Sequence, residues 1–316
     1  MRGLLKTRPA WSQFLVLISI TLVSLFIFGL LGASVLGKIT GKTLTEVSDF
    51  SKWDYSKPET NFIIRGTLII QFISFFVLPV VICAWLFSTD SKKYLGLKRP
   101  SNAGYIAAGI GIMIISIPLI NLVGELNRNI QLPSSIERWM KNGEESAAKS
   151  INALLAKQTV SELLLNIACI AGLAAVGEEL LFRGMAQRLL IKMFRSPMTG
   201  IVVAAILFSA LHMQFYGFVP RLLLGVFLGL AYWYSGSLWV SILGHFVYDA
   251  LLIVLSYFNP EMLKEGESVK LSGMAFTAAI STVLVVLIIV WMKMKSATTY
   301  EKVYADDTVP VKDHPF

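Results

Sequence analysis

The chain has 316 residues, of which 55% are hydrophobic and only 15% are charged, and its formal net charge is +8. This composition excludes an ordinary soluble domain, which carries more charge and interrupts its apolar segments more often. It also argues against nucleic-acid binding, because the positive residues form no dense patch interleaved with aromatic side chains. The apolar residues fall in blocks of about 20, which is the length of a helix that crosses a bilayer.

These blocks predict an all-α protein, a polytopic transmembrane helical bundle with about eight spans. The first block follows Arg2, Lys6 and Arg8 and is longer than the apolar region of a signal peptide, so we expect a retained first helix. In two later blocks, Pro79 and Pro118 predict kinks. In chain order, the predicted spans cover residues 12–37, 62–87, 103–124, 161–182 (continuing as helix to 194), 198–213, 218–234, 238–257 and 272–292.

The same blocks divide the chain into four predicted parts. Residues 1–126 hold three transmembrane helices, residues 127–160 form an amphipathic connection, residues 161–293 form a transmembrane core, and residues 294–316 form a polar tail. Eight spans would place most positive residues on one side of the membrane. The positive-inside rule therefore predicts that both termini are cytoplasmic, and we expect an integral protein of a bacterial inner membrane. These positive residues are Arg2, Lys6, Arg8, Lys92, Lys93, Lys98, Arg99, Arg188, Lys192, Arg195, Lys293, Lys295 and Lys302.

Ionisable residues inside membrane spans are costly, and most of them serve a function. Three groups of this kind occur in the predicted core: Glu178-Glu179-x-x-x-Arg183, Phe208-x-x-x-His212 and His245-x-x-x-Asp249. Glu178 lies about 18 residues before the turn near residue 197, and His212 lies about 15 residues after it. Two antiparallel helices would therefore place both side chains within roughly 5 Å of the same depth.

Helical spacing predicts how these side chains face one another. His245 and Asp249 are four residues apart and share one face of their helix. Glu179 and Arg183 have the same spacing, so we expect an ion pair between them. This pair leaves Glu178 facing in another direction and free for chemistry.

Four further residues in the apolar blocks carry polar or reactive groups. Arg65 either pairs with a buried acid or extends to the nearby interface. Asn166 lies about three turns before Glu178 and either lines the same cavity or, as is more common for such a residue, packs between helices. Cys83 and Cys169 are predicted to be packed thiols rather than a disulfide or a metal pair.

The buried polar residues suit two kinds of hydrolytic chemistry. A buried carboxylate paired with a histidine could activate a water molecule, while a second histidine stabilises the oxyanion. Alternatively, a glutamate, two histidines and an aspartate form a reasonable ligand set for zinc, with water completing it. The sequence requires no cofactor, and zinc is the one candidate, although no His-Glu-x-x-His motif is present.

The three motifs, in this order and on membrane spans, resemble those of the CPBP family. This family comprises CAAX prenyl protease 2-like enzymes and bacteriocin-processing or immunity-type membrane proteins. The resemblance covers about residues 160–255, whereas residues 1–126 resemble no family that we recognise. It implies an eight-helix fold and an endopeptidase active within the bilayer.

The resemblance also implies a role for each motif residue. Glu178 and His212 would activate the water, His245 and Asp249 would form the oxyanion site, and Glu179 and Arg183 would support the arrangement. Related eukaryotic enzymes tend to have Asn at the position of Asp249. An ionised Asp cannot donate a hydrogen bond to an oxyanion, so Asp249 would orient His245, be protonated or bind a metal ion. If a metal is bound, its expected ligands are Glu178, His212, His245 and Asp249.

Three functions remain open from the sequence. The first is an intramembrane endopeptidase of the CAAX-protease type, glutamic or metal-assisted, that acts on a peptide or lipidated protein in contact with membrane lipid. The second is a non-catalytic bacteriocin-immunity or membrane scaffold protein. The third is a proton-coupled transporter in which Glu178, His212, His245 and Asp249 form a relay. The absence of paired, broken helical repeats and of a Gly-rich phosphate loop disfavours the third.

Overall fold

A computed structural model describes residues 2–49, 53–130, 134–156, 159–260 and 271–304. Every regular element within these residues is a helix, which confirms the predicted all-α fold. Seven helices are long and apolar enough to cross a membrane, so the protein is a polytopic transmembrane bundle. These helices are Ala10–Thr40, Pro58–Phe87, Gly104–Arg128, Val160–Phe194, Phe218–Ser235, Leu238–Phe258 and Gly273–Lys295.

The fifth predicted span, residues 198–213, is shorter than expected. It corresponds to α12 (Pro197–Ala210), which has 14 residues and is therefore about 21 Å long at 1.5 Å per residue. A bilayer core is about 30 Å thick, so α12 crosses only part of it. The chain leaves the helix at Leu211 and turns within the bundle, which places His212 just beyond the helix end.

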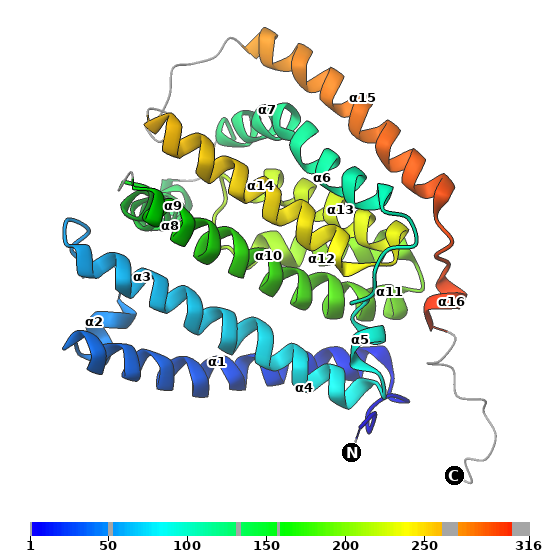
Figure 1. The fold of residues 1–316 in the computed structure, drawn as a ribbon, viewed down its shortest axis with the longest axis horizontal. Helices are drawn as coiled ribbons and strands as arrows, with labels where there is room; N and C mark the ends of the chain where they lie inside the picture. Colours follow the sequence, from blue (N-terminus) through cyan, green and yellow to red (C-terminus); the bar gives the residue numbers. More distant parts are fainter. Residues whose placement is uncertain (1, 50–52, 131–133, 157–158, 261–270, 305–316) are drawn as a thin grey trace.

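The helices form three layers, which are seen edge-on in Figure 1. In the first layer, α1 packs along the continuous helix made of α3, the π-helical segment η2 and α4. The middle layer contains the broken helix α9–α11 with α12, α13 and α14, and the opposite layer contains α6, α7 and α15. The bounds are α1 (Ala10–Thr40), α2 (Leu44–Ser48), α3 (Pro58–Gln71), η2 (Phe72–Val77), α4 (Leu78–Phe87), α5 (Ser91–Tyr94), α6 (Gly104–Ile115), α7 (Ile117–Arg128), α9 (Val160–Asn166), η3 (Ile167–Gly172), α10 (Leu173–Glu178), η4 (Glu179–Gln187), α11 (Arg188–Phe194), α13 (Phe218–Ser235), α14 (Leu238–Phe258), α15 (Leu271–Lys295) and α16 (Tyr300–Tyr304).

Both predicted proline positions interrupt regular α-helix. Pro118 lies in the first turn of α7, directly after the break that separates α6 from α7. The Ser281 hydroxyl of α15 donates a 2.5 Å hydrogen bond to the Ile115 carbonyl at this break, so a neighbouring helix satisfies a carbonyl group in a membrane span. Pro79 lies in the first turn of α4, and the π-helical segment η2 directly precedes this helix.

Helix α8 (Ser134–Leu155) occupies most of the predicted amphipathic connection. Leu154 is buried, and Ala147 and Ile151 line the cavity described below, whereas Glu145 and Lys149 are exposed on the other side. The helix is therefore amphipathic, and its apolar side packs against the bundle.

A polar cluster holds the C-terminal end of α8 in place. The Asn61 amide donates a hydrogen bond to the Ala153 carbonyl at 3.2 Å, and the Asn166 amide donates one to the Leu154 carbonyl at 2.7 Å. Arg65 forms an ion pair with Glu162 and donates to the Asn166 side-chain oxygen at 2.8 Å. Of the two alternatives for Arg65, the structure thus shows the pairing with an acid. Of the two alternatives for Asn166, the structure shows packing between helices, because its amide is buried in this cluster and does not line the cavity described below.

Three of the positively charged segments, α5, α11 and α16, lie at one end of the bundle in Figure 1. They carry Lys92, Lys93, Arg188, Lys192 and Lys302. The backbone N–H of Leu238 donates to the Gly96 carbonyl at 2.9 Å, which joins the α5 loop to the start of α14. The Tyr304 hydroxyl donates to the Arg188 carbonyl at 2.6 Å, which joins the tail to α11. Residues 305–316 of the predicted tail, including His314, lie outside the described residues.

Candidate active site

The first motif lies where the α10 helix changes to the π-helical segment η4, between Glu178 and Glu179. A π-helix forms i→i+5 hydrogen bonds, so it changes the direction in which successive side chains point, and it often occurs at functional sites. Here both glutamates reach the same histidine: Glu179 Oε1 lies 3.0 Å from His245 Nδ1, and Glu178 Oε2 lies 3.9 Å from His245 Nε2. The two carboxylates lie at opposite nitrogens of the imidazole, so Glu178 faces away from the Glu179–Arg183 pair, in the direction of His212.

Glu179 and Arg183 form the predicted ion pair, with 2.6 Å between Glu179 Oε1 and Arg183 Nη1. Both side chains are almost completely buried. Arg183 also donates a 3.1 Å hydrogen bond to the Gly225 carbonyl of α13. One turn later, Gln187 makes the same contact with the Gly229 carbonyl at 3.1 Å. The η4 segment is thus fixed to α13 by two side chains that reach glycine carbonyls, which a small residue leaves open to approach.

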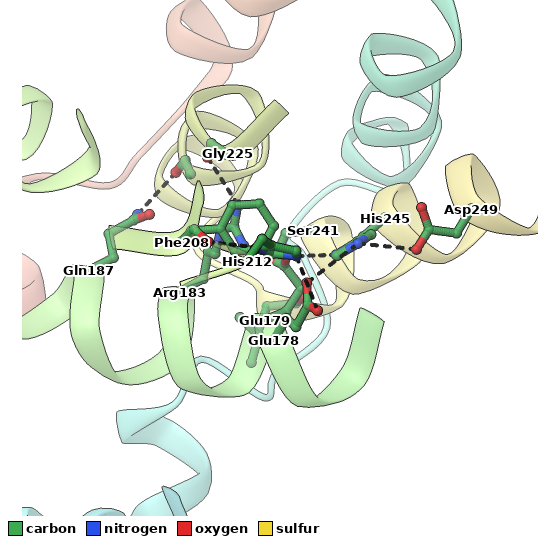
Figure 2. Close-up of polar contacts among 12 residues, drawn as sticks. Glu178, Glu179, Arg183, Gln187, Phe208, His212, Gly225, Ser241, His245 and Asp249 are labelled. Atoms are coloured by element: carbon green, nitrogen blue, oxygen red, sulfur yellow. Dashed lines mark hydrogen bonds and ion pairs between the residues drawn. The ribbon is translucent and has the colours of Figure 1, made fainter. Parts of the chain in front are cut away.

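His245 projects from α14 into a ring of carboxylates, as Figure 2 shows. Its Nδ1 atom faces Glu179, and its Nε2 atom lies 3.3 Å from Asp249 Oδ2, one turn along α14. A neutral imidazole carries a hydrogen on only one nitrogen. Because both nitrogens face carboxylate oxygens, the arrangement suits a doubly protonated His245 that donates in both directions.

His212 approaches the same point from the turn after α12. Its Nδ1 atom lies 2.8 Å from the Phe208 carbonyl oxygen, and its Nε2 atom lies 3.9 Å from Glu178 Oε1. A carbonyl oxygen can only accept, so Nδ1 carries the hydrogen and Nε2 presents its lone pair towards Glu178. The separation between Nε2 and the carboxylate is too long for a direct hydrogen bond and leaves space for a shared water molecule.

The Phe208 ring packs among the polar groups of the site. It lies edge-on to the rings of His212 and His245, with centroid separations of 5.0 and 6.3 Å. The guanidinium carbon of Arg183 lies 4.6 Å from the centre of the same ring, in a cation–π arrangement. Phe208 therefore separates Arg183 from the two histidines and fills space that water would otherwise occupy.

Two helices, α7 and α8, hold the turn that carries His212. The Asn127 amide of α7 donates to the carbonyls of Phe215 and Tyr216 at 2.7 and 2.9 Å. The Glu144 carboxylate of α8 accepts a 2.9 Å hydrogen bond from the Tyr216 backbone N–H. The position of His212 therefore depends on groups outside the three motifs.

The site opens into a central cavity of about 850 Å³ between α3, η2, α8, η3, α10, α13 and α14. Its polar end is formed by Glu178, His212, Arg221, His245 and Asp249. Its other walls are mostly apolar and include Ile64, Leu68, Phe72, Phe75, Ile151 and Ile170. Cys169 also lines this cavity, whereas Cys83 is buried in α4; both thiols are free, as predicted.

The structure brings the six predicted site residues together, but it does not arrange them as a metal centre. Within the described part of the chain, no group of three or more His, Cys, Asp or Glu side chains is placed so that it could hold a metal ion. His245 uses both nitrogens on carboxylates, and the His212 Nε2 atom remains 3.9 Å from Glu178.

The sequence analysis did not identify two residues that matter for the site: Arg221, which lines the cavity, and Glu144, which contacts the turn that carries His212. Arg221 lies in an apolar span, so the same rule that identified the motifs could have identified it. Glu144 lies in the connecting helix among several other charged residues, and nothing in its spacing marks its contact with the His212 turn.

Comparison with known proteins bears directly on the six predicted site residues. Residues 160–251 match a family model described as Rce1-like, type II CAAX prenyl endopeptidase. The match confirms the resemblance predicted from the three motifs and includes every residue of the cluster from Glu178 to Asp249. Residues 9–122 match a second family model, described as putative ABC-transporter type IV, in a region where the sequence analysis had recognised no resemblance. No curated protein and no solved structure is found to match the chain.

Proposed function

We propose that this integral membrane protein, whose residues 160–251 form an Rce1-like type II CAAX prenyl endopeptidase domain, hydrolyses a peptide bond with a water molecule activated by Glu178 and His212. The observation that supports this proposal best is the opposition of the Glu178 carboxylate and the His212 Nε2 atom, 3.9 Å apart at the wall of the central cavity. A water held between them can lose a proton to either group and attack a carbonyl carbon.

The remaining residues support this chemistry in the proposed mechanism. His245 lies beside Glu178, and both its N–H groups face carboxylates, so when doubly protonated it stabilises the oxyanion on the attacked carbonyl through its positive charge. Asp249 orients His245 by accepting from Nε2 and needs no hydrogen of its own for this role. Glu179 and Arg183 keep His245 in place from the other side. The proton taken from the water then passes to the leaving amine, which completes the cleavage.

The cavity suggests a peptide substrate with an apolar attachment or segment. Its apolar walls from α3, η2 and α8 adjoin the polar end that holds Glu178. A lipid chain or an apolar side chain in contact with these walls would place the peptide bond next to the polar groups. We infer from the positive-inside rule that the positive end of the bundle faces the cytoplasm, and we propose a bacterial inner membrane as the location.

A cleavage assay in proteoliposomes tests the proposal. Prenylated peptides and leader peptides would be offered to the wild type and to the Glu178→Gln and His212→Ala variants. Glu145→Gln, the same substitution at an exposed position of α8, is the control. We expect Glu178→Gln to lower kcat by at least about 100-fold, which is the usual contribution of a general base, and the control to keep wild-type activity.

Cleavage that survives Glu178→Gln would refute the mechanism. A wild type that cleaves none of these peptides would favour the scaffold function instead. Chelator treatment followed by zinc addition belongs in the same assay, because loss and recovery of cleavage would establish a metal-assisted reaction in place of the glutamate–histidine one.

A further inference from the structure

A separate cavity of about 470 Å³, the tail cavity, lies at the end of the bundle where α11 and α16 are found in Figure 1. It is formed by the start of α12, the end of α13, the end of α15 and the segment that leads into α16. Among the described residues, none lines both the tail cavity and the central cavity. The tail cavity is therefore not part of the candidate active site.

Three hydroxyl groups in the lining of the tail cavity have a hydrogen available for a ligand. Ser196, Ser296 and Thr299 each use the hydroxyl oxygen to accept from a backbone N–H two or three residues later, at 3.1–3.3 Å. A hydroxyl group carries one hydrogen in addition to its acceptor lone pairs. Within the described chain, no acceptor is found for the hydrogens of these three groups. They can therefore donate to a molecule in the cavity.

The charge around the tail cavity is positive. Lys293 lines it, and no Asp or Glu does so in the part of the chain that the structure describes. Lys98 adds a second positive charge nearby, because its Cε atom and Thr298 Oγ1 would lie 4.0 and 3.2 Å from a Cβ at Gly236. The exposed acid Glu301 follows the cavity lining in sequence but is not part of it. An ammonium group with several O–H donors and no carboxylate is suited to binding an anion.

The other side of the tail cavity is apolar and belongs to the membrane spans. Met198 and Leu230 line it, and Met198 is exposed. Lys293 lies in the last turn of the span α15, and Trp233 and Tyr234 lie at the end of the span α13. Trp and Tyr at the end of a span are typical of the membrane–water interface. The cavity thus places anion-binding groups next to apolar surface at the level of lipid headgroups.

We propose that the tail cavity binds an anionic phospholipid, with Lys293 and the three hydroxyl groups on the phosphate and the start of an acyl chain along Met198 and Leu230. Basic pockets between transmembrane helices are known to take lipid headgroups of this kind. A choline or ethanolamine group carries its own positive charge, and no carboxylate among the described lining residues would pair with it. The headgroup that fits is therefore one with a net negative charge.

Three soluble ligands test the proposal on the full-length protein in a non-ionic detergent. They are dihexanoyl-phosphatidylglycerol, dihexanoyl-phosphatidylcholine and glycerophosphoglycerol, which is the phosphatidylglycerol headgroup without acyl chains. Calorimetric titration measures the affinity, and the rise in melting temperature confirms binding to the folded protein. We expect phosphatidylglycerol to bind at least about tenfold more tightly than phosphatidylcholine, which is the effect of one charged hydrogen bond. Equal affinities for these two lipids would overturn the proposal. If glycerophosphoglycerol binds as tightly as phosphatidylglycerol, the ligand is a soluble phosphate ester and the lipid assignment is overturned.

A matched pair of lysine variants assigns the binding to the tail cavity. Lys293→Gln should weaken phosphatidylglycerol binding about tenfold, because it removes the charged donor. Lys295→Gln makes the same change at the other exposed lysine in the last turn of α15, outside the lining, and should change the affinity by less than about twofold. Lys293→Arg should retain most of the affinity, since arginine keeps the charge and the N–H donors. Equal losses from Lys293→Gln and Lys295→Gln would show a general attraction to positive surface and overturn the proposal.

Two further variants separate the hydroxyl groups and the proposed cleavage site from this binding. Ser296→Ala should weaken phosphatidylglycerol binding at least about twofold by removing one donor, whereas Ser256→Ala in α14, outside both cavities, should not. Glu178→Gln should bind the lipid as the wild type does. A wild type that cleaves no peptide but binds phosphatidylglycerol through Lys293 would refute the proposed function and support the lipid site. Binding that neither Lys293→Gln nor Ser296→Ala changes would overturn the lipid site whatever the result of the cleavage assay.

Discussion

Oε1 of Glu179 lies 3.0 Å from Nδ1 of His245, and the same oxygen accepts a 2.6 Å hydrogen bond from Arg183. One carboxylate oxygen thus joins the first motif to the third, and Glu179, Arg183 and His245 are all buried. The position of His245 depends on Glu179 from one side and on Asp249 from the other.

The Glu179–Arg183 pair should be essential to the fold as well as to the site. Removing one partner of a buried ion pair leaves an uncompensated charge and costs about 3–5 kcal/mol. We therefore expect Glu179→Ala and Arg183→Ala each to lower the free energy of unfolding in detergent strongly, and the double variant to lose less than the sum of the two. Denaturation in a mild detergent measures all three.

The exposed pair Glu137–Lys141 of α8 has the same i,i+4 spacing and serves as the control. Its removal should change the free energy of unfolding by at most about 0.5 kcal/mol, because exposed pairs of this spacing contribute little. Additive losses from Glu179→Ala and Arg183→Ala would show that the two side chains do not stabilise the protein as a pair.

Two substitutions distinguish whether Asp249 is needed as a hydrogen-bond acceptor or for its negative charge. The Asn side-chain oxygen can still accept from His245 Nε2, so Asp249→Asn should keep kcat/KM within about tenfold of the wild type. Asp249→Ala removes the acceptor, and we expect a loss of about 10- to 100-fold, as is typical when the group that orients a functional histidine is deleted. Steady-state cleavage kinetics compare the two. A loss with Asn as large as with Ala would mean that the negative charge itself is required.

Glu144 should act on catalysis through the turn that carries His212. Glu144→Ala leaves the Tyr216 N–H without its charged acceptor, a contact of about 1.5–3 kcal/mol, and so loosens the turn. We expect kcat to fall about tenfold or more with KM little changed, since small misplacements of a catalytic group are costly. Glu144→Gln should restore activity because its amide oxygen can still accept. Glu145→Ala is the matched control in α8, and equal kcat values for the two alanine variants would contradict this role.

The hairpin between α11 and α12 depends on Gly200. A Cβ at this position would lie 2.5 Å from the Ile191 backbone nitrogen and 2.6 Å from its Cα atom, and a backbone cannot give way as a side chain can. We expect Gly200→Ala to lower the melting temperature in detergent substantially. Gly111→Ala in α6 meets only Ile288 Cδ1 at 3.8 Å and should be neutral or stabilise by up to about 1 kcal/mol. Equal melting temperatures for the two variants would show that the helices do not approach so closely.

The sequence by itself determined the class of fold and predicted the residues of the candidate site. Long apolar blocks are a strong local signal, because a helix in lipid must satisfy its own backbone hydrogen bonds over about 20 residues. The cost of ionisable groups in such blocks is also local, so it identified Glu178, His212, His245 and Asp249 without knowledge of their contacts. The i,i+4 rule likewise predicted the ion pair between Glu179 and Arg183.

Only the tertiary structure decided how these residues face one another. The change to a π-helix at Glu179 brings both glutamates to His245, and the early end of α12 places His212 in a turn rather than on a helix. The contact of Glu144 with that turn and the entry of Arg221 into the cavity also became visible only in the folded chain. Such features depend on packing between helices that are far apart in sequence, and local periodicity carries no information about that packing.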